Sequence, residues 1–141
     1  MIWCNHGPLP EILRPYARPD ALLVQARYQP TGWLRRKQVL PLPSLPEKPV
    51  LVLAGIAHPE RFLATLRQLG IHPVRTMLYP DHHTFTWADL QSIEAWLDDH
   101  LVIMTEKDAA RLPPELGVYA LLMEPVLIQG EAALLQRLEQ L

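Results

Sequence analysis

The sequence predicts an α/β fold: a small, mainly parallel sheet flanked by helices. Short apolar segments alternate with segments of helical periodicity along residues 49–141, which is typical of parallel strands joined by crossover helices. The run Val50–Ala54 has no polar interruption, as expected for a strand that is covered on both faces. Pro59 and Gly70 suit the first position and the end of a helix, so they bracket the helical segment that follows this strand.

The remaining elements follow from capping residues and apolar periodicity. Thr86 and Asp89, three residues apart, form a capping box at the start of one helix. Thr105 and Asp108 repeat the pattern before a shorter helix, which Pro113 ends. The other expected strands cover residues 20–26, 74–79, 101–104 and 118–123, and a final amphipathic helix covers residues 130–141.

Proline is unevenly distributed and divides the chain. The 141 residues include 15 prolines, and they are dense in the first third of the sequence. Proline has no amide donor and a fixed φ, so regular structure cannot run throughout that third. We therefore expect residues 1–48 to form a partial or tethering region with one strand, and residues 49–141 to form the compact α/β domain.

Charge and cysteine content exclude several classes of function. The net charge of −2 provides no basic field for nucleic acid. Arg35–Lys37 is a local basic cluster that we interpret as a solvated turn, with contact to phosphate or anionic lipid as the alternative. The lone Cys4 can form neither an internal disulfide nor a cysteine-rich zinc site. The sequence has no apolar run of roughly 20 residues and no signal-peptide pattern at its start, so we expect a cytoplasmic protein.

Three polar clusters occupy equivalent positions in the pattern of strands and helices. The clusters are Gly55–Phe62, Pro80–His83 and Thr105–Asp108, and each follows an expected strand and precedes an expected helix. Loops that follow parallel strands emerge at the same edge of a sheet, where ligands usually bind. The sequence therefore predicts one shared polar site.

The second cluster has the sharpest chemistry. Asp81 can orient a neighbouring imidazole and fix its tautomer, which suits general-base catalysis on a hydroxyl group. Neighbouring side chains on an extended loop diverge, so we expect one histidine to face the site and choose His82 as catalytic together with Asp81. His83 is assigned to binding. The alternatives are a loop whose histidines bond the backbone, and a metal site, for which no second group of ligands is evident.

The first and third clusters suit the binding of phosphate. Gly55 lies where the backbone must turn, and Arg61 lies in the first turn of a helix whose free amides attract anions. Thr105 caps the next helix, and Lys107 opposes the dipole of that helix, which hints at neutralisation of phosphate. Glu106 could instead pair with Lys107 or Arg61 and hold the loops together. Plain helix caps and surface turns are the alternative interpretation of both clusters.

One motif is absent from these 141 residues. They contain no Gly-x-x-x-x-Gly-Lys-[Ser/Thr] loop, which P-loop enzymes use to cradle phosphates and to hold magnesium. We therefore expect no phosphate transfer of the P-loop type from this chain alone.

Three strings carry a resemblance to a known family. LAGIAHPERFLATLRQLGI, YPDHHTFTWADL and VIMTEKDAARL, in this order and at these distances, resemble the carboxyl-terminal half of tetraacyldisaccharide 4'-kinase, the lipid A kinase of Gram-negative bacteria. The resemblance is firm over residues 49–112 and extends with less specificity to residue 141. It implies a Rossmann-like domain of the kind that accompanies a P-loop kinase domain.

The resemblance also implies a function. That family uses ATP and Mg²⁺ to phosphorylate the 4'-hydroxyl of a tetraacyl glucosamine disaccharide 1-phosphate, a step of lipid A and lipopolysaccharide biosynthesis. The histidine of the family's catalytic aspartate–histidine pair falls on His82, whereas its aspartate and its Walker loop belong to the other half of the kinase. This implies a fragment, a truncated gene product or a domain whose P-loop partner is a separate chain. It also implies peripheral contact with the cytoplasmic face of the inner membrane.

Two other functions remain open from the residues alone. The same loops could bind a phosphorylated sugar or nucleotide without turnover, as a non-catalytic module. Asp81, His82 and His83 could also ligate a metal in a phosphoesterase, although such a site needs more carboxylates and histidines than the clusters supply.

Overall fold

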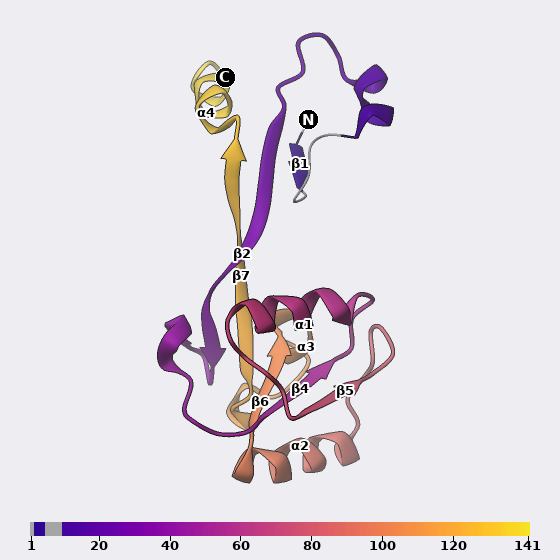
Figure 1. The fold of residues 1–141 in the computed structure, drawn as a ribbon, viewed down its shortest axis with the longest axis vertical. Helices are drawn as coiled ribbons and strands as arrows, with labels where there is room; N and C mark the ends of the chain where they lie inside the picture. Colours follow the sequence, from indigo (N-terminus) through magenta and orange to yellow (C-terminus); the bar gives the residue numbers. More distant parts are fainter. Residues whose placement is uncertain (1, 5–9) are drawn as a thin grey trace. The chain divides into compact units, whose positions relative to one another are not determined.

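The structure, a computed structural model, describes residues 2–4 and 10–141 (Figure 1). The backbone of Cys4 is described, whereas its side chain, and so the thiol considered above, is not. The strands of the described residues are β1 (Ile2–Cys4), β2 (Val24–Arg35), β3 (Gln38–Leu40), β4 (Val50–Ala54), β5 (Arg75–Leu78), β6 (Leu101–Thr105) and β7 (Tyr119–Gln129). The α-helices are α1 (Pro59–Gln68), α2 (Trp87–Asp99), α3 (Glu106–Ala109) and α4 (Glu131–Glu139), and 3₁₀ segments cover Glu11–Tyr16, Leu42–Ser44 and Pro114–Leu116.

The strands form one mainly parallel sheet in the order β1-β2-β7-β6-β4-β5, with β3 paired to β2. The pairs β4–β5, β4–β6 and β6–β7 are parallel, and β1 is parallel to β2. The short strand β3 is antiparallel to β2. The predicted α/β class, a mainly parallel sheet flanked by helices, is confirmed.

The chain divides into two compact units. The larger unit is Pro30–Leu122, and the smaller unit combines Met1–Gln29 with Met123–Leu141. The expected boundary after residue 48 thus falls inside the larger unit. The physical reason is Trp33, which is fully buried there, meets Tyr119 edge to face and donates its indole N–H to the Leu42 carbonyl.

The basic cluster at the end of β2 is only partly solvated. The Arg35 guanidinium lies 5.0 Å from the centre of the Tyr119 ring, and its Nε donates to the Gly117 carbonyl at 3.1 Å. Arg36 and Lys37 are exposed and form the turn to β3 with φ of 48° and 66°. The interpretation as a solvated turn therefore fits these two residues and is wrong for Arg35.

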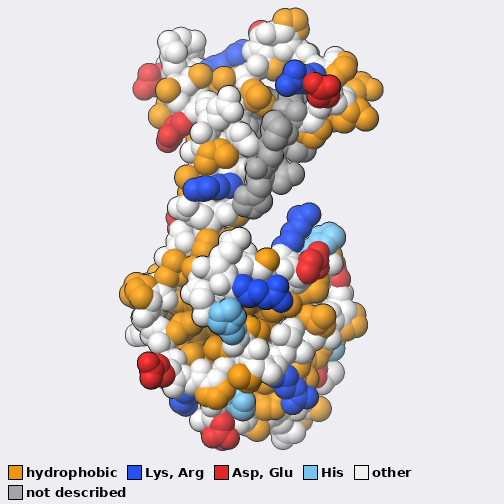
Figure 2. Space-filling view, viewed as in Figure 1, with side chains coloured by type: hydrophobic (Ala, Val, Ile, Leu, Met, Phe, Trp, Pro, Cys, Tyr) orange, Lys and Arg blue, Asp and Glu red, His pale blue; other side chains and the backbone are white. Residues whose placement is uncertain are grey.

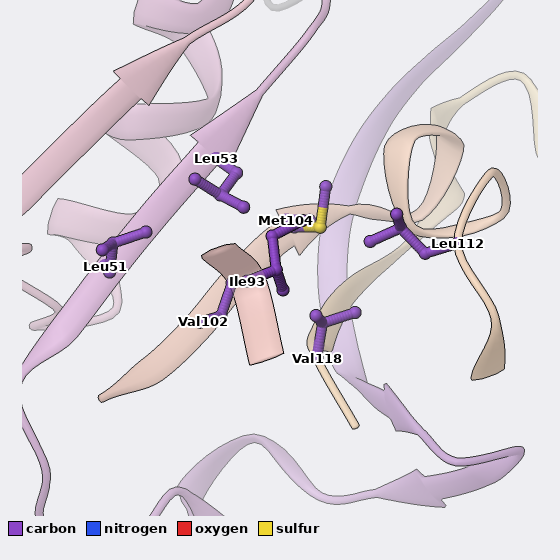
Figure 3. Close-up of a cluster of buried hydrophobic side chains, with 7 residues drawn as sticks. All are labelled: Leu51, Leu53, Ile93, Val102, Met104, Leu112 and Val118. Atoms are coloured by element: carbon purple, nitrogen blue, oxygen red, sulfur yellow. The ribbon is translucent and has the colours of Figure 1, made fainter. Parts of the chain in front are cut away.

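The core of the larger unit lies on β4 and β6. α1 and α2 lie on opposite sides of the sheet (Figure 1). One cluster of buried side chains joins the α2 side of both strands to the segment after α3, as Figure 3 shows: Leu51, Leu53, Ile93, Val102, Met104, Leu112 and Val118. Val52 and Ile103, which alternate with these residues along the strands, are also fully buried. Both faces of the two strands are thus covered, as the uninterrupted apolar run predicts.

The smaller unit contains residues 24–29 of β2, residues 123–129 of β7 and α4. Arg137 of α4 donates to the Asp20 carbonyl at 2.9 Å. Gly130 precedes α4 with φ of 83°, and a Cβ at this position would lie 2.5 Å from the Leu23 carbonyl oxygen, so only glycine fits. Hydrophobic side chains are frequent on the surface of this unit (Figure 2). Across the described residues, no helix combines the length and apolarity that crossing a bilayer requires.

Candidate functional site

Three loops meet at the carboxyl edge of β4, β5 and β6. The three strands run parallel, so their following loops leave the sheet on one side. The backbone N–H of Tyr79 donates to the Ala54 carbonyl at 2.8 Å, and the N–H of His82 donates to the Gly55 carbonyl at 3.3 Å. The bond between His82 and Gly55 confirms the predicted convergence of the first and second clusters, and side chains join the third cluster to both.

A buried carboxylate connects the first and third loops. Asp108 is fully buried, and its Oδ2 accepts hydrogen bonds from the Gly55 N–H and from the Thr105 hydroxyl, both at 3.0 Å. Its own N–H donates to the Thr105 oxygen, so Thr105 caps α3 as predicted. A Cβ on Gly55 would lie 3.3 Å from Asp108 Oδ1 and 3.4 Å from the Pro80 carbonyl oxygen. A side chain at position 55 would therefore be in tight contact with Asp108 and in ordinary contact with the Pro80 carbonyl.

A second carboxylate connects the second and third loops. Asp81 Oδ1 accepts from the His82 backbone N–H at 3.0 Å and lies 3.5 Å from Lys107 Nζ. The other oxygen, Oδ2, lies 3.5 Å from Nε2 of the His82 ring. Lys107 thus pairs with Asp81, where the sequence left open a pair with Glu106.

The two histidines of the second cluster have different surroundings. The His82 side chain is 72% exposed, and its backbone has φ of 60°, which is sparsely populated for a residue with a Cβ. The His83 side chain is 23% exposed, stacks on Tyr79 with ring centres 4.5 Å apart, and places Nε2 3.1 Å from Asp89 Oδ2. The expected divergence of the two rings is confirmed, and His82 is the more exposed of the two.

An arginine that the sequence analysis did not single out holds the second loop. Arg111 Nη1 donates to the His83 carbonyl at 3.2 Å, and Nη2 lies 3.3 Å from His82 Nδ1. The same guanidinium lies 3.7 Å from Asp108 Oδ1. Arg111 follows Asp108 by three residues, a spacing that brings side chains together on a helical turn and that could have signalled the pair.

Two of the predicted binding residues stay outside this network. Arg61 lies in the first turn of α1 and Glu106 begins α3, and both are exposed. Among the described residues, neither side chain is joined to the other loops by a hydrogen bond or an ion pair. Within the same part of the chain, no three or more His, Cys, Asp or Glu side chains are arranged to hold a metal ion.

Asp89 is the charged group beside His83 and Tyr79. It completes the predicted capping box, because its Oδ2 accepts from the Thr86 N–H at 2.8 Å while its own N–H donates to the Thr86 hydroxyl oxygen. The hydrogen bond from the Thr86 backbone, with further help from the hydroxyl and from His83, lowers the pKa of Asp89. Burial raises the pKa of the nearby Tyr79 hydroxyl, and the Asp89 charge adds to that shift.

Asp89→Asn should therefore reduce stability in a pH-dependent way. A carboxyl with a depressed folded pKa stabilises the protein above its unfolded pKa of about 4, and this contribution is lost as the pH falls through the folded value. We expect the variant to be less stable by about 1 kcal/mol at pH 7, with the difference shrinking below about pH 4. Urea unfolding of both proteins from pH 7 to pH 3 measures it. Asp99→Asn, at an exposed position at the end of α2, is the control, and a difference that is constant with pH would contradict the prediction.

The chain is similar to proteins of one family. The family model for tetraacyldisaccharide-1-P 4'-kinase matches residues 2–141. The tetraacyldisaccharide 4'-kinase of Rhodopseudomonas palustris (strain BisB18) is 39% identical over 124 residues, which cover 75% of this chain and 36% of the relative. That of Polaromonas naphthalenivorans (strain CJ2) is 34% identical over 149 residues, or 95% of this chain and 41% of the relative. The chain thus spans well under half the length of these two relatives.

A solved structure shares the fold. The crystal structure of LpxK from Aquifex aeolicus in complex with ATP superposes with a TM-score of 0.65 at 22% sequence identity. The match covers 84% of this chain and 36% of that one.

Proposed function

Because this chain belongs to the tetraacyldisaccharide-1-P 4'-kinase family, we propose that it is the carboxyl-terminal part of such a kinase and forms one side of the active site. The kinase would transfer the γ-phosphoryl group of ATP to the 4'-hydroxyl of a tetraacyl disaccharide 1-phosphate in lipid A biosynthesis. The observation that carries the proposal is the meeting of all three family-like strings at one sheet edge, where Asp108 and Asp81 join them.

The exposed side chains at this edge suit phosphoryl transfer. Enzymes of this class work mainly by positioning the reactants and by stabilising charge. We assign His82, with Asp81 beside it, to the acceptor hydroxyl, because its ring is exposed and anchored. Lys107 is half exposed and Arg61 is exposed, so both can meet phosphate oxygens. Gly55, Thr105, Glu106 and His83 would shape the surface around them.

The residues of this part of the kinase suit ATP better than they suit Mg²⁺. ATP would supply the phosphoryl group, and the cationic side chains at the sheet edge fit its phosphates. Among the described residues no cluster of metal ligands is present, so we propose no metal-binding role for this part of the kinase. A P-loop segment, on the same or another polypeptide, would be the partner that completes the site. By its resemblance to the family, we propose that this work takes place at the cytoplasmic face of the inner membrane.

A chimeric enzyme tests the proposal. We expect a Rhodopseudomonas palustris kinase, in which this chain replaces the matching segment, to phosphorylate the tetraacyl disaccharide 1-phosphate in an ATP-dependent assay. The 141-residue chain alone should show no such activity, since it lacks the phosphate-cradling loop. A chimera that folds but stays inactive would argue for a non-catalytic binding module. Robust activity of the chain alone would show that the proposed division of the active site is wrong.

A further inference from the structure

We propose that Arg111 is a positioning residue that sets the tautomer of His82, keeping Nδ1 unprotonated and the ring proton on Nε2. The contact at issue joins Arg111 Nη2 to His82 Nδ1 at 3.3 Å. A guanidinium has only N–H donors and stays charged, so it cannot accept a hydrogen bond from the ring. Two facing N–H groups would repel each other. Nδ1 must therefore be the acceptor, which leaves Nε2 to carry the proton.

The second ring nitrogen agrees with this assignment. His82 Nε2 lies 3.5 Å from Asp81 Oδ2, and an ionised carboxylate offers only acceptors. Asp81 and Arg111 thus contact opposite ring nitrogens with complementary polarity. From the sequence we expected Asp81 to fix the tautomer of His82. The contact of the ring with Arg111, at 3.3 Å, is shorter than its contact with Asp81, at 3.5 Å.

Arg111 is itself held by a fixed anchor. Its Nη1 lies 3.7 Å from Oδ1 of the fully buried Asp108, an oxygen that has no hydrogen-bond partner among the described residues. The side chain of Arg111 is only 25% exposed, and it also donates to the His83 carbonyl. A guanidinium with this support keeps its orientation better than a free surface arginine.

The backbone at His82 is held in a strained conformation that suits this arrangement. With φ of 60°, the residue costs free energy that the surrounding loop must offset. Its N–H donates to Asp81 Oδ1 at 3.0 Å and also contacts the Gly55 carbonyl at 3.3 Å. These bonds fix the start of the side chain, and Arg111 and Asp81 then fix the ring.

For catalysis, the position of Arg111 decides when His82 can act as a base, a consequence that rests on the proposed function. The resemblance places the aspartate of the family's catalytic pair on the other half of the kinase, so Asp81 is not that partner. With the ring proton on Nε2, the basic nitrogen of His82 is Nδ1, and Arg111 occupies its lone pair. The acceptor hydroxyl can therefore give a proton to His82 only after Arg111 withdraws from Nδ1.

Nitrogen NMR of the whole chain tests the inference without any assay of activity. Long-range ¹H–¹⁵N correlation, recorded above the pH range in which histidines titrate, reports which ring nitrogen carries the proton. We expect His82 to show one protonated Nε2 and one unprotonated Nδ1. In Arg111→Met the two signals should move toward each other as the tautomers mix, and in Arg111→Lys, which keeps a donor, they should stay apart.

Two other histidines serve as internal controls. His83 is held by Asp89, so its ring signals should not change in Arg111→Met if the loop stays folded. His72 is exposed and lies outside the three loops, so it reports the averaged signals of an unrestrained ring. Wild-type His82 signals averaged like those of His72, or His82 signals unchanged in Arg111→Met, would overturn the inference. Because the test needs no turnover, its failure and the failure of the chimera are independent results.

Discussion

Asp108→Ala is expected to lower the free energy of unfolding by about 3 kcal/mol, which is large for a single polar substitution. The carboxylate is fully buried and accepts bonds from the Gly55 N–H and the Thr105 hydroxyl. Its removal leaves the Gly55 donor without its partner in a buried site and removes the anion beside Arg111. Equilibrium unfolding in urea, followed by far-UV circular dichroism, gives the value.

The matched control for this experiment is Asp99→Ala. Asp99 is exposed at the end of α2, so its removal should change stability by less than about 0.5 kcal/mol. Asp108→Asn keeps one carbonyl oxygen as an acceptor and should fall between the wild type and Asp108→Ala. Similar urea midpoints for the two alanine variants would show that the buried carboxylate is not what joins the first and third loops.

His82→Ala in the chimeric kinase is expected to lower kcat by about 10²- to 10⁴-fold, the range for a group that takes part in proton transfer. The side chain is 72% exposed and its contacts with Arg111 and Asp81 lie at the surface, so the same variant should lose little thermal stability. Steady-state kinetics with the tetraacyl disaccharide 1-phosphate, together with a melting curve of each variant, separates the two effects.

His83→Ala should affect stability more than catalysis. That ring stacks on Tyr79 and bonds Asp89, so its loss should lower the melting temperature and reduce kcat less than His82→Ala does. His72→Ala, at an exposed position between α1 and β5, is the control for removal of a surface imidazole. Equal losses of kcat in the His82 and His83 variants would remove the distinction between the two residues.

The core elements of the larger unit could be predicted because their signals are local. The run Val50–Ala54 matches β4 residue for residue, and α1 begins at Pro59 as expected. The capping box of Thr86 and Asp89 is present at the start of α2. A fully covered strand must be apolar along its length, and a helix start must satisfy its free N–H groups, so both leave a clear mark in the sequence.

The long strands could not be predicted to their full length. The expected strand at residues 20–26 overlaps only the start of β2, which runs from Val24 to Arg35. The expected strand at residues 118–123 continues as β7 to Gln129, past Pro125. Strand formation in these segments depends on pairing with a partner rather than on the residues' own preference. Pro125 also argues against a strand when the sequence is considered alone, because proline has no N–H to donate to a neighbouring strand.

The sequence by itself determined that polar loops would gather at one edge of a parallel sheet, because alternating strands and helices leave few other topologies. Only the tertiary structure decided which atoms meet there. Asp108 reaches Gly55 across 53 positions of sequence, and Arg111 reaches His82 across 29. Such contacts depend on strand register and on the direction in which each side chain leaves its loop. Neither quantity is encoded by neighbouring residues, so the contacts of Asp108 and Arg111 with the other loops became visible only in three dimensions.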